Sequence, residues 1–168
     1  MSFPKPKPIQ DPTPEKAYLY AIRLLAKRDY SEPKMLKKLR EKGFDEEHCQ
    51  HALNEIIAKN YLREDEYIRQ KTKGWMYKGY PPETIAMRFS QEDLKVDPET
   101  IDLIFEENSV TTLDQIQWLT RKKKATSEIF QSGEENYKKR QKVLAYIVGK
   151  GHKFDDALTA LRAILHPQ

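Results

Sequence analysis

Apolar residues recur every three or four positions along nearly the whole chain, which is the spacing of amphipathic helices. The expected inward-facing positions are Ala17, Tyr20, Ala21, Leu24, Leu25, Met35, Leu36, Leu39, Cys49, Ala52, Leu53, Ile56 and Ile57, then Tyr67, Ile68, Trp75, Met76, Ile85, Phe89, Ile101, Ile104 and Phe105, then Leu113, Ile116, Leu119, Tyr137, Leu144, Ile147, Val148, Leu158, Leu161 and Ile164. No segment shows the alternation typical of a half-buried strand. The pattern therefore predicts an all-α protein.

A short phrase that marks a helix boundary occurs three times at roughly even spacing. It reads GFDEE at residues 43–47, VDPE at residues 96–99 and GHKFDD at residues 151–156. Its glycines can end a helix in the left-handed conformation, and Asp45, Asp97 and Asp155 can accept hydrogen bonds from the free N–H groups of the next helix. Such a repeat predicts an array of small helical units. The expected three-helix units are residues 15–62, 63–109 and 110–168.

Two stretches fall outside this helical pattern. Residues 1–14 hold five of the ten prolines and are expected to be an extended or disordered tail. Residues 126–134 are polar, contain a glycine and are expected to be an internal linker of the third unit. No apolar run is long enough for a membrane span or a signal peptide, and a single cysteine excludes an internal disulfide, so we expect a cytoplasmic protein without a membrane segment.

Charge is unevenly distributed, although the net charge is only +4. Residues 16–42 contain nine Lys/Arg against three Asp/Glu, and residues 111–142 contain eight against four. The middle of the chain, especially residues 92–107, is acidic. This alternation favours a partner that is part protein and part polyanion, since uniform basicity would serve nucleic acid alone. The competing interpretation is a set of solvated helix faces.

The residues expected to contact such a partner are mostly cations on three helices, together with one tyrosine in a proline-flanked turn. They are Lys34, Lys37, Lys38, Arg40 and Lys42, then Arg121, Lys122 and Lys123, then Lys138, Lys139, Arg140 and Lys142, and Tyr80. Spacing of three and four residues keeps most of the first cluster on one side of its helix, which suits a contact with phosphates. A merely soluble surface explains the first cluster equally well, and a favourable helix dipole explains the second nearly as well.

No residue pattern marks a catalytic, cofactor or metal site. The chain has no Gly-rich phosphate loop, no Gly-x-Ser-x-Gly and no His-Glu-x-x-His. His48, Cys49 and His51 share one turn, but no second ligand pair follows at the spacing of a zinc site. Cys49 lies on an apolar helix face and is expected to be a buried thiol. We therefore expect neither an enzyme nor a bound cofactor or metal.

The order of these features resembles that of the RecX family, bacterial regulators of the RecA recombinase. Residues 20–31 (YAIRLLAKRDYS) and 36–45 (LKKLREKGFD) look strongly like its first repeat, and residues 140–147 (RQKVLAYI), followed by Phe154-Asp155, are similar to its third. The resemblance covers about residues 15–165. It implies an elongated, curved protein of three tandem three-helix units that lies in the groove of the RecA filament on DNA and restrains recombination and repair.

The sequence therefore leads to the hypothesis of a monomeric, non-enzymatic modulator of RecA. Its first and third units would lie against DNA or acidic filament surface, and its acidic middle unit against basic protein surface. The DNA contact, to single or double strands, is expected to be non-specific. The alternative is a helical DNA-binding protein that acts alone, with one short helix of each unit against the duplex. Dependence of binding on the filament separates the two hypotheses.

Overall fold

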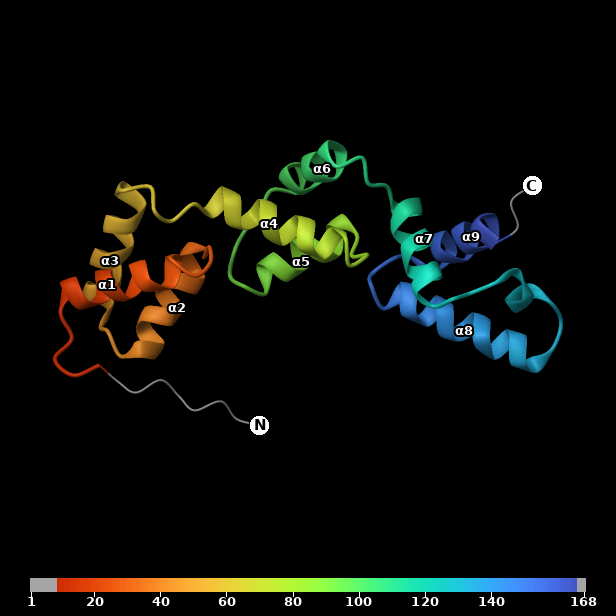
Figure 1. The fold of residues 1–168 in the computed structure, drawn as a ribbon, viewed down its shortest axis with the longest axis horizontal. Helices are drawn as coiled ribbons and strands as arrows, with labels where there is room; N and C mark the ends of the chain where they lie inside the picture. The colour runs from red at the N-terminus through yellow and green to blue at the C-terminus, as the bar shows by residue number, and fades with distance from the viewer. Residues whose placement is uncertain (1–8, 166–168) are drawn as a thin grey trace. The chain divides into compact units, whose positions relative to one another are not determined.

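The computed structural model describes residues 9–165, and helices are the only regular secondary structure in this part of the chain (Figure 1). The described residues form nine α-helices and one 3₁₀ helix, with no strand among them. In chain order these are α1 (Pro14–Leu25), α2 (Glu32–Lys42), α3 (Glu46–Ala58), α4 (Glu64–Met76), α5 (Pro82–Ser90), α6 (Pro98–Glu107), α7 (Thr112–Lys122), η1 (Ser127–Phe130), α8 (Glu134–Val148) and α9 (Phe154–Leu165). The expected all-α fold is confirmed.

In chain order the helices fall into three groups of three, but in space they form two compact units. Unit 1 contains the described residues up to Gln70 together with Glu92–Leu94. Unit 2 contains Lys71–Gln91 and the described residues from Lys95 onward. Helix α4 begins in unit 1 and ends in unit 2, so the second group of helices is not a separate compact unit.

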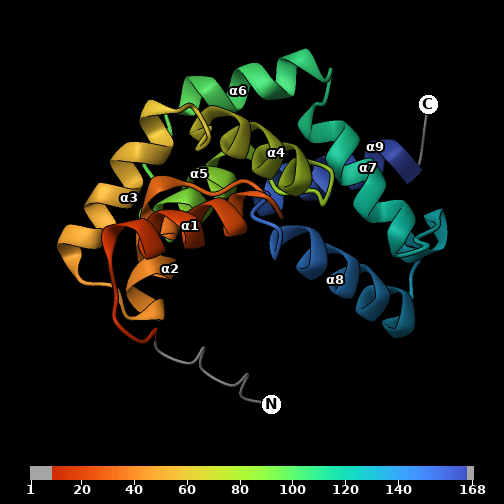
Figure 2. The same cartoon turned by 60° about the vertical axis from the view of Figure 1, so that its left-hand side comes forward.

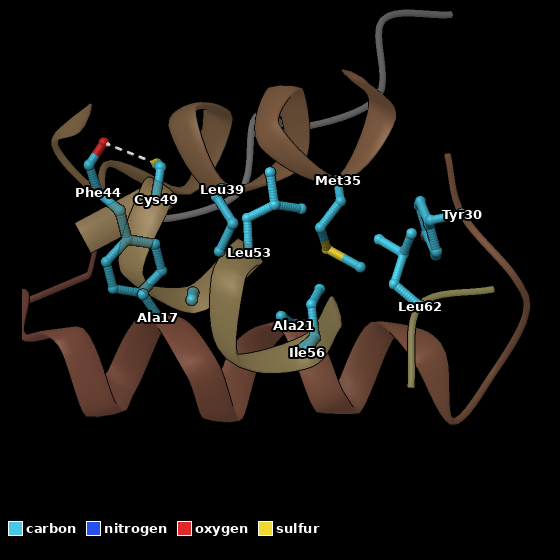
Figure 3. Close-up of a cluster of buried hydrophobic side chains, with 11 residues drawn as sticks. Ala17, Ala21, Tyr30, Met35, Leu39, Phe44, Cys49, Leu53, Ile56 and Leu62 are labelled. Carbon is cyan, nitrogen blue, oxygen red and sulfur yellow. Dashed lines mark hydrogen bonds between the residues drawn. The ribbon is translucent and has the colours of Figure 1, made fainter. Parts of the chain in front are cut away.

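Helices α1 and α3 pack closely in unit 1 because small side chains lie between them (Figure 3). Ala17 and Ala21, one turn apart on α1, are both fully buried. Met35 and Leu39 of α2 and Ile56 of α3 are also fully buried in this core. Burying a side chain of the size of these last three stabilises a fold by about 1.5–3 kcal/mol. The apolar periodicity of the sequence therefore predicts this core well.

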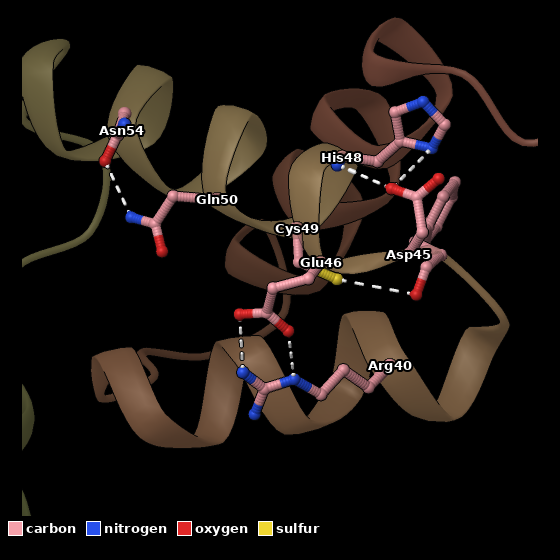
Figure 4. Close-up of polar contacts among 8 residues, drawn as sticks. Arg40, Asp45, Glu46, His48, Cys49, Gln50 and Asn54 are labelled. Carbon is pink, nitrogen blue, oxygen red and sulfur yellow. Dashed lines mark hydrogen bonds and ion pairs between the residues drawn. The ribbon is translucent and has the colours of Figure 1, made fainter.

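The repeated phrase forms helix caps in its first two copies. Asp45 accepts a hydrogen bond from the backbone N–H of His48 at 2.8 Å (Figure 4), and Asp97 caps α6 in a similar way. The third copy differs from the expectation, because α9 already begins at Phe154 and Asp155 therefore lies in the first helical turn. Its charge still favours the positive end of the helix dipole there.

Glycines in unit 2 allow the backbones of the second and third groups of helices to approach each other. Gly151 has φ 106°, and a Cβ at this position would lie 1.9 Å from the Thr84 hydroxyl oxygen. Gly79 has φ 81°, and a Cβ there would lie 2.8 Å from the side chain of Leu119. The left-handed conformation expected of the glycine in the third phrase is therefore confirmed, with a close approach that the phrase alone does not reveal.

Two buried polar side chains complete this junction within unit 2. Nε2 of Gln115 donates hydrogen bonds to the carbonyl oxygens of Met76 and Tyr80 at 2.8 and 3.0 Å. Nε2 of His152 lies 3.0 Å from the carbonyl oxygen of Gly79. Burial lowers the pKa of His152 and favours its neutral form. Backbone groups at the end of α4 and in the turn after it are thus satisfied by side chains from α7 and from the turn before α9.

The segment expected as a linker is partly ordered and packed. Residues 127–130 form η1, which follows α7 and precedes α8 in the chain (Figure 2). Ile129 is only 4% exposed, in a core shared with α7, α8 and α9. A hydrogen bond of 3.3 Å from the Arg140 guanidinium to the Ile129 carbonyl oxygen ties η1 to α8. One buried isoleucine in a polar stretch gives no periodic signal, so the sequence did not reveal this contact.

Four apolar residues expected inside are exposed. Ile57, Leu113, Tyr137 and Val148 are 40%, 53%, 52% and 37% exposed. Ile57 and Val148 directly follow buried isoleucines, and one residue step turns a helix by about 100°. Their side chains therefore point away from the core that their neighbours enter.

Most of the expected tail, residues 1–8, lies outside the described residues. The part that is described follows unit 1 closely: the Ile9 N–H donates to the Lys42 carbonyl oxygen at 3.2 Å. Nζ of Lys16 reaches the carbonyl oxygens of Gln10 and Asp11 at 3.0 and 2.7 Å. Among the described helices, none is both long and apolar enough to cross a membrane.

Candidate nucleic-acid interface

A row of alternating cationic and aromatic side chains lies on unit 2, and we call it the cation–aromatic track. It consists of Arg88 on α5, Tyr80 in the turn before α5, Lys150 in the turn after α8, Tyr146 on α8, and Lys123 at the end of α7. Arg88 and Lys150 lie 4.0 and 4.1 Å from the Tyr80 ring centre. Lys123 and Lys150 lie 4.1 and 5.7 Å from the Tyr146 ring centre. Each ring therefore makes cation–π contacts with two cations.

The surroundings of the track restrict its side chains. Arg88 also lies 5.7 Å from the ring of Trp75, which packs edge-on against buried Phe89. The Tyr80 carbonyl is held by Gln115, and a hydrogen bond between the side chains of Lys150 and Tyr80 lowers the pKa of Tyr80. The cations of the track are thus partly positioned by their neighbours, which reduces the entropy lost when an anionic partner binds.

A pocket with a volume of about 460 Å³ lies at one end of the track, and we call it the lysine pocket. Its charged lining consists of Lys123, Lys124, Lys139, Lys142 and Glu128. Lys123 belongs to both the pocket and the track. Lys124 and Lys142 are exposed, and neither forms an ion pair within the described residues. The pocket and the track together form one cationic surface on unit 2.

The cations of α2 are largely neutralised by unit 1 itself. Nζ of Lys34 lies 2.6 Å from a Glu92 carboxylate oxygen and donates to the Tyr67 hydroxyl at 2.7 Å. Tyr67 in turn donates to Glu92 at 2.6 Å, and burial together with this carboxylate raises its pKa. Lys34 is therefore part of the packing of unit 1 rather than a cation open to a partner.

The other expected residues of α2 differ in their surroundings. Lys38 pairs with Glu41 at 2.6 Å, and Arg40 forms two hydrogen bonds with the Glu46 carboxylate (Figure 4). Lys37 is exposed and forms no ion pair within the described residues, whereas Lys42 lies 5.8 Å from the ring of Tyr20. The pair of Lys38 and Glu41 follows from their spacing of three residues on one helix. The contacts of Arg40 and Lys42 involve other helices, so the periodicity of α2 does not reveal them.

The remaining expected residues lie on α7 and α8. Arg121 and Lys122 are exposed at the end of α7. On α8, Lys138 and Lys139 pair with Glu134 and Glu135. Of the expected residues, the structure brings Tyr80, Lys123, Lys139 and Lys142 together on the cationic surface. It adds four that were not among the expected contact residues, which are Arg88, Lys124, Tyr146 and Lys150.

Helix α6 presents a face of opposite charge. Glu99, Asp102 and Glu106 are exposed on it without an ion pair within the described residues. Leu103, between them in sequence, is 52% exposed. Buried residues Ile101, Ile104 and Phe105 lie on the other side of the helix. The acidic character expected for the middle of the chain is therefore concentrated on one surface.

Comparison with known proteins gives consistent results. The family model described as "RecX, first three-helix domain" matches residues 17–55. Regulatory protein RecX of Haemophilus influenzae (strain PittEE) is 28% identical over 141 residues, which cover 83% of this chain and 89% of that protein. Regulatory protein RecX of Vibrio campbellii is 27% identical over 141 residues, which cover 84% and 86%. The crystal structure of RecX from Lactobacillus salivarius matches with a TM-score of 0.66 at 17% identity, covering 90% and 96% of the two chains.

These matches support a RecX family protein. The resemblance noted in the sequence is thereby confirmed, and the helical fold is that of the solved RecX structures. The residues that match the family model lie in unit 1, whereas the cation–aromatic track and the lysine pocket lie in unit 2. The relatives from Haemophilus influenzae and Vibrio campbellii are named regulatory proteins.

Proposed function

We propose that this RecX-family protein modulates, most simply inhibits, the RecA recombinase in homologous recombination and DNA repair by binding the RecA nucleoprotein filament. The observation that supports this best is the cation–aromatic track of unit 2. Its ring-held cations suit a polyanion, and phosphate contacts of this kind position a protein without reading bases. Such phosphate contacts are sufficient for non-specific binding to the nucleic acid of a filament.

The acidic face of α6 supports a partner that also contains protein. Exposed carboxylates around Leu103 would repel a bare nucleic acid, whereas they complement a basic protein surface that offers an apolar contact. A partner that combines both surfaces is a filament of protein on DNA. The mechanism that we favour is occlusion, in which the bound protein blocks access to several filament subunits and slows nucleotide turnover without chemistry of its own.

The test compares binding to free RecA, to bare single-stranded DNA, and to RecA assembled on that DNA, together with inhibition of strand exchange. We expect the filament to retain the protein best and strand exchange to fall. The variant Lys123→Gln/Lys150→Gln should lose at least about fivefold in filament affinity. The control Lys27→Gln/Lys95→Gln has the same net charge, changes exposed lysines outside the track, and should behave as wild type.

The track also suits the second candidate, a DNA-binding protein that acts alone. Equal affinity for bare DNA and for the filament, with no effect on strand exchange, would favour that candidate and refute regulation of RecA.

A further inference from the structure

The lysine pocket is built differently from the track. Its apolar lining consists of Ala125, Ile129 and Val143, and its cations come from the end of α7 and from α8. Burial of Ile129 and the hydrogen bond from Arg140 hold η1 against α8, so the pocket depends on the packed part of the expected linker. We propose that the lysine pocket is a phosphate-binding site that holds the backbone of a nucleic-acid strand. This proposal rests on the proposed function in one respect, since it takes the partner to contain nucleic acid.

Charge identifies the ligand as an anion. Four lysines and one glutamate line the pocket. Lys139 is paired with Glu135 at 2.7 Å, but Lys124 and Lys142 form no ion pair within the described residues. Ammonium groups gathered around one pocket raise the local positive potential, which attracts an anion. Lysine ammoniums act on phosphate as point charges that can each donate several hydrogen bonds.

The backbone at Lys124 contributes to this arrangement. Its φ is 51°, a left-handed conformation that is uncommon for a residue with a side chain. The turn follows directly after α7, where the Lys124 N–H donates to the Arg121 carbonyl oxygen at 2.9 Å. The chain therefore reverses at a lysine rather than at a glycine, which keeps an ammonium group at the edge of the pocket.

Size and continuity favour a nucleic-acid strand over a small anion. A volume of about 460 Å³ falls within the range of roughly 300–1,000 Å³ typical of ligand sites, so the pocket has room for more than one phosphate group. Lys123 links it to Tyr146 and Lys150 of the track, so cations continue beyond the pocket. A strand carries phosphates along its length and can neutralise both the lysine pocket and the cation–aromatic track, whereas a single free phosphate can neutralise only one of them.

The experiment measures binding of a fluorescein-labelled oligo-dT to the full chain by fluorescence anisotropy over a range of salt concentrations, without RecA. The pocket variant is Lys124→Gln/Lys142→Gln, and the matched control is Lys27→Gln/Lys95→Gln. All four lysines are exposed and without an ion pair in the described part of the chain, so both variants lose the same charge. Thermal unfolding of both verifies folding, and Lys139→Gln provides a second pocket variant if the first is unstable.

We expect the pocket variant to bind at least about fivefold more weakly than the control at low salt, and its slope of log K against log salt to be less negative by about 1.4, or 0.7 for each lost phosphate contact. Equal affinity and slope for the two variants would overturn the proposal. The proposal would also be overturned if ATP or inorganic phosphate bound to Lys124 and Lys142 but the binding of oligo-dT did not depend on these two lysines.

The proposed function can fail independently. If the pocket variant shows the expected loss but the wild-type protein leaves RecA strand exchange unchanged, the phosphate site stands and the regulatory function is refuted. If the wild-type protein inhibits strand exchange while the pocket variant binds oligo-dT as the control does, the phosphate site is refuted alone.

Discussion

Replacement of Gln115 by leucine tests how the second and third groups of helices are joined within unit 2. Gln115 is fully buried, and its Nε2 donates to the carbonyl oxygens of both Met76 and Tyr80. Leucine has a similar size but no donor. The Met76 carbonyl also accepts the Gly79 N–H at 2.9 Å and so keeps one partner, whereas the Tyr80 carbonyl depends on Gln115.

The magnitude follows from these contacts. The Tyr80 carbonyl is partly buried, so leaving it without this partner costs up to about 1–3 kcal/mol, and losing the hydrogen bond to Met76 costs about 0.5–1.5 kcal/mol. Oε1 of Gln115 is itself buried without a partner in the described structure, so its removal recovers part of this loss. We expect the free energy of unfolding to fall by about 2 kcal/mol, a large share of the roughly 5–15 kcal/mol typical of a protein.

Urea unfolding followed by tryptophan fluorescence measures this effect, because both tryptophans of the chain, Trp75 and Trp118, lie in unit 2. The control is Gln117→Leu on the same helix, a partly exposed glutamine without a hydrogen bond in the described residues. It should change the free energy of unfolding by less than about 0.5 kcal/mol. The reasoning would be refuted if Gln115→Leu lowered the free energy of unfolding by less than about 0.5 kcal/mol, or if both variants lowered it equally.

Three further predictions concern stability. Burial lowers the pKa of His152, so its neutral form should contribute fully to the free energy of unfolding above the usual pKa of about 6.5. This contribution should decrease as the pH falls below that value. The difference in unfolding free energy between wild type and His152→Gln should therefore shrink toward acid pH. Gly151→Ala should destabilise by about 2–4 kcal/mol through backbone strain and contact with Thr84, and adding Thr84→Ala should recover part of this in urea unfolding; no recovery would exclude the contact. Lys34→Gln should lower the melting temperature of unit 1 more than Lys37→Gln, because the Lys34 charge is paired and partly buried; equal melting curves would contradict this.

The sequence by itself determined the elements of this protein. Helices, their order in three groups of three, and most of their buried positions follow from local periodicity, since a stripe of apolar residues forms a core only if the backbone is helical. Helix caps at Asp45 and Asp97 are local in the same sense. The RecX resemblance was recognisable for this reason, because it consists of such short phrases in a fixed order.

Tertiary structure decided which charges are available to a partner. Lys34 is neutralised by Glu92, whereas Lys124 and Lys142 form no ion pair within the described residues. Tyr80 and Lys150 come together only because the turns after α4 and α8 meet in unit 2. Periodicity describes how one helix presents its faces, but the electrostatic energy of a side chain depends on which groups of other segments lie within a few ångströms of it, and packing alone determines those distances.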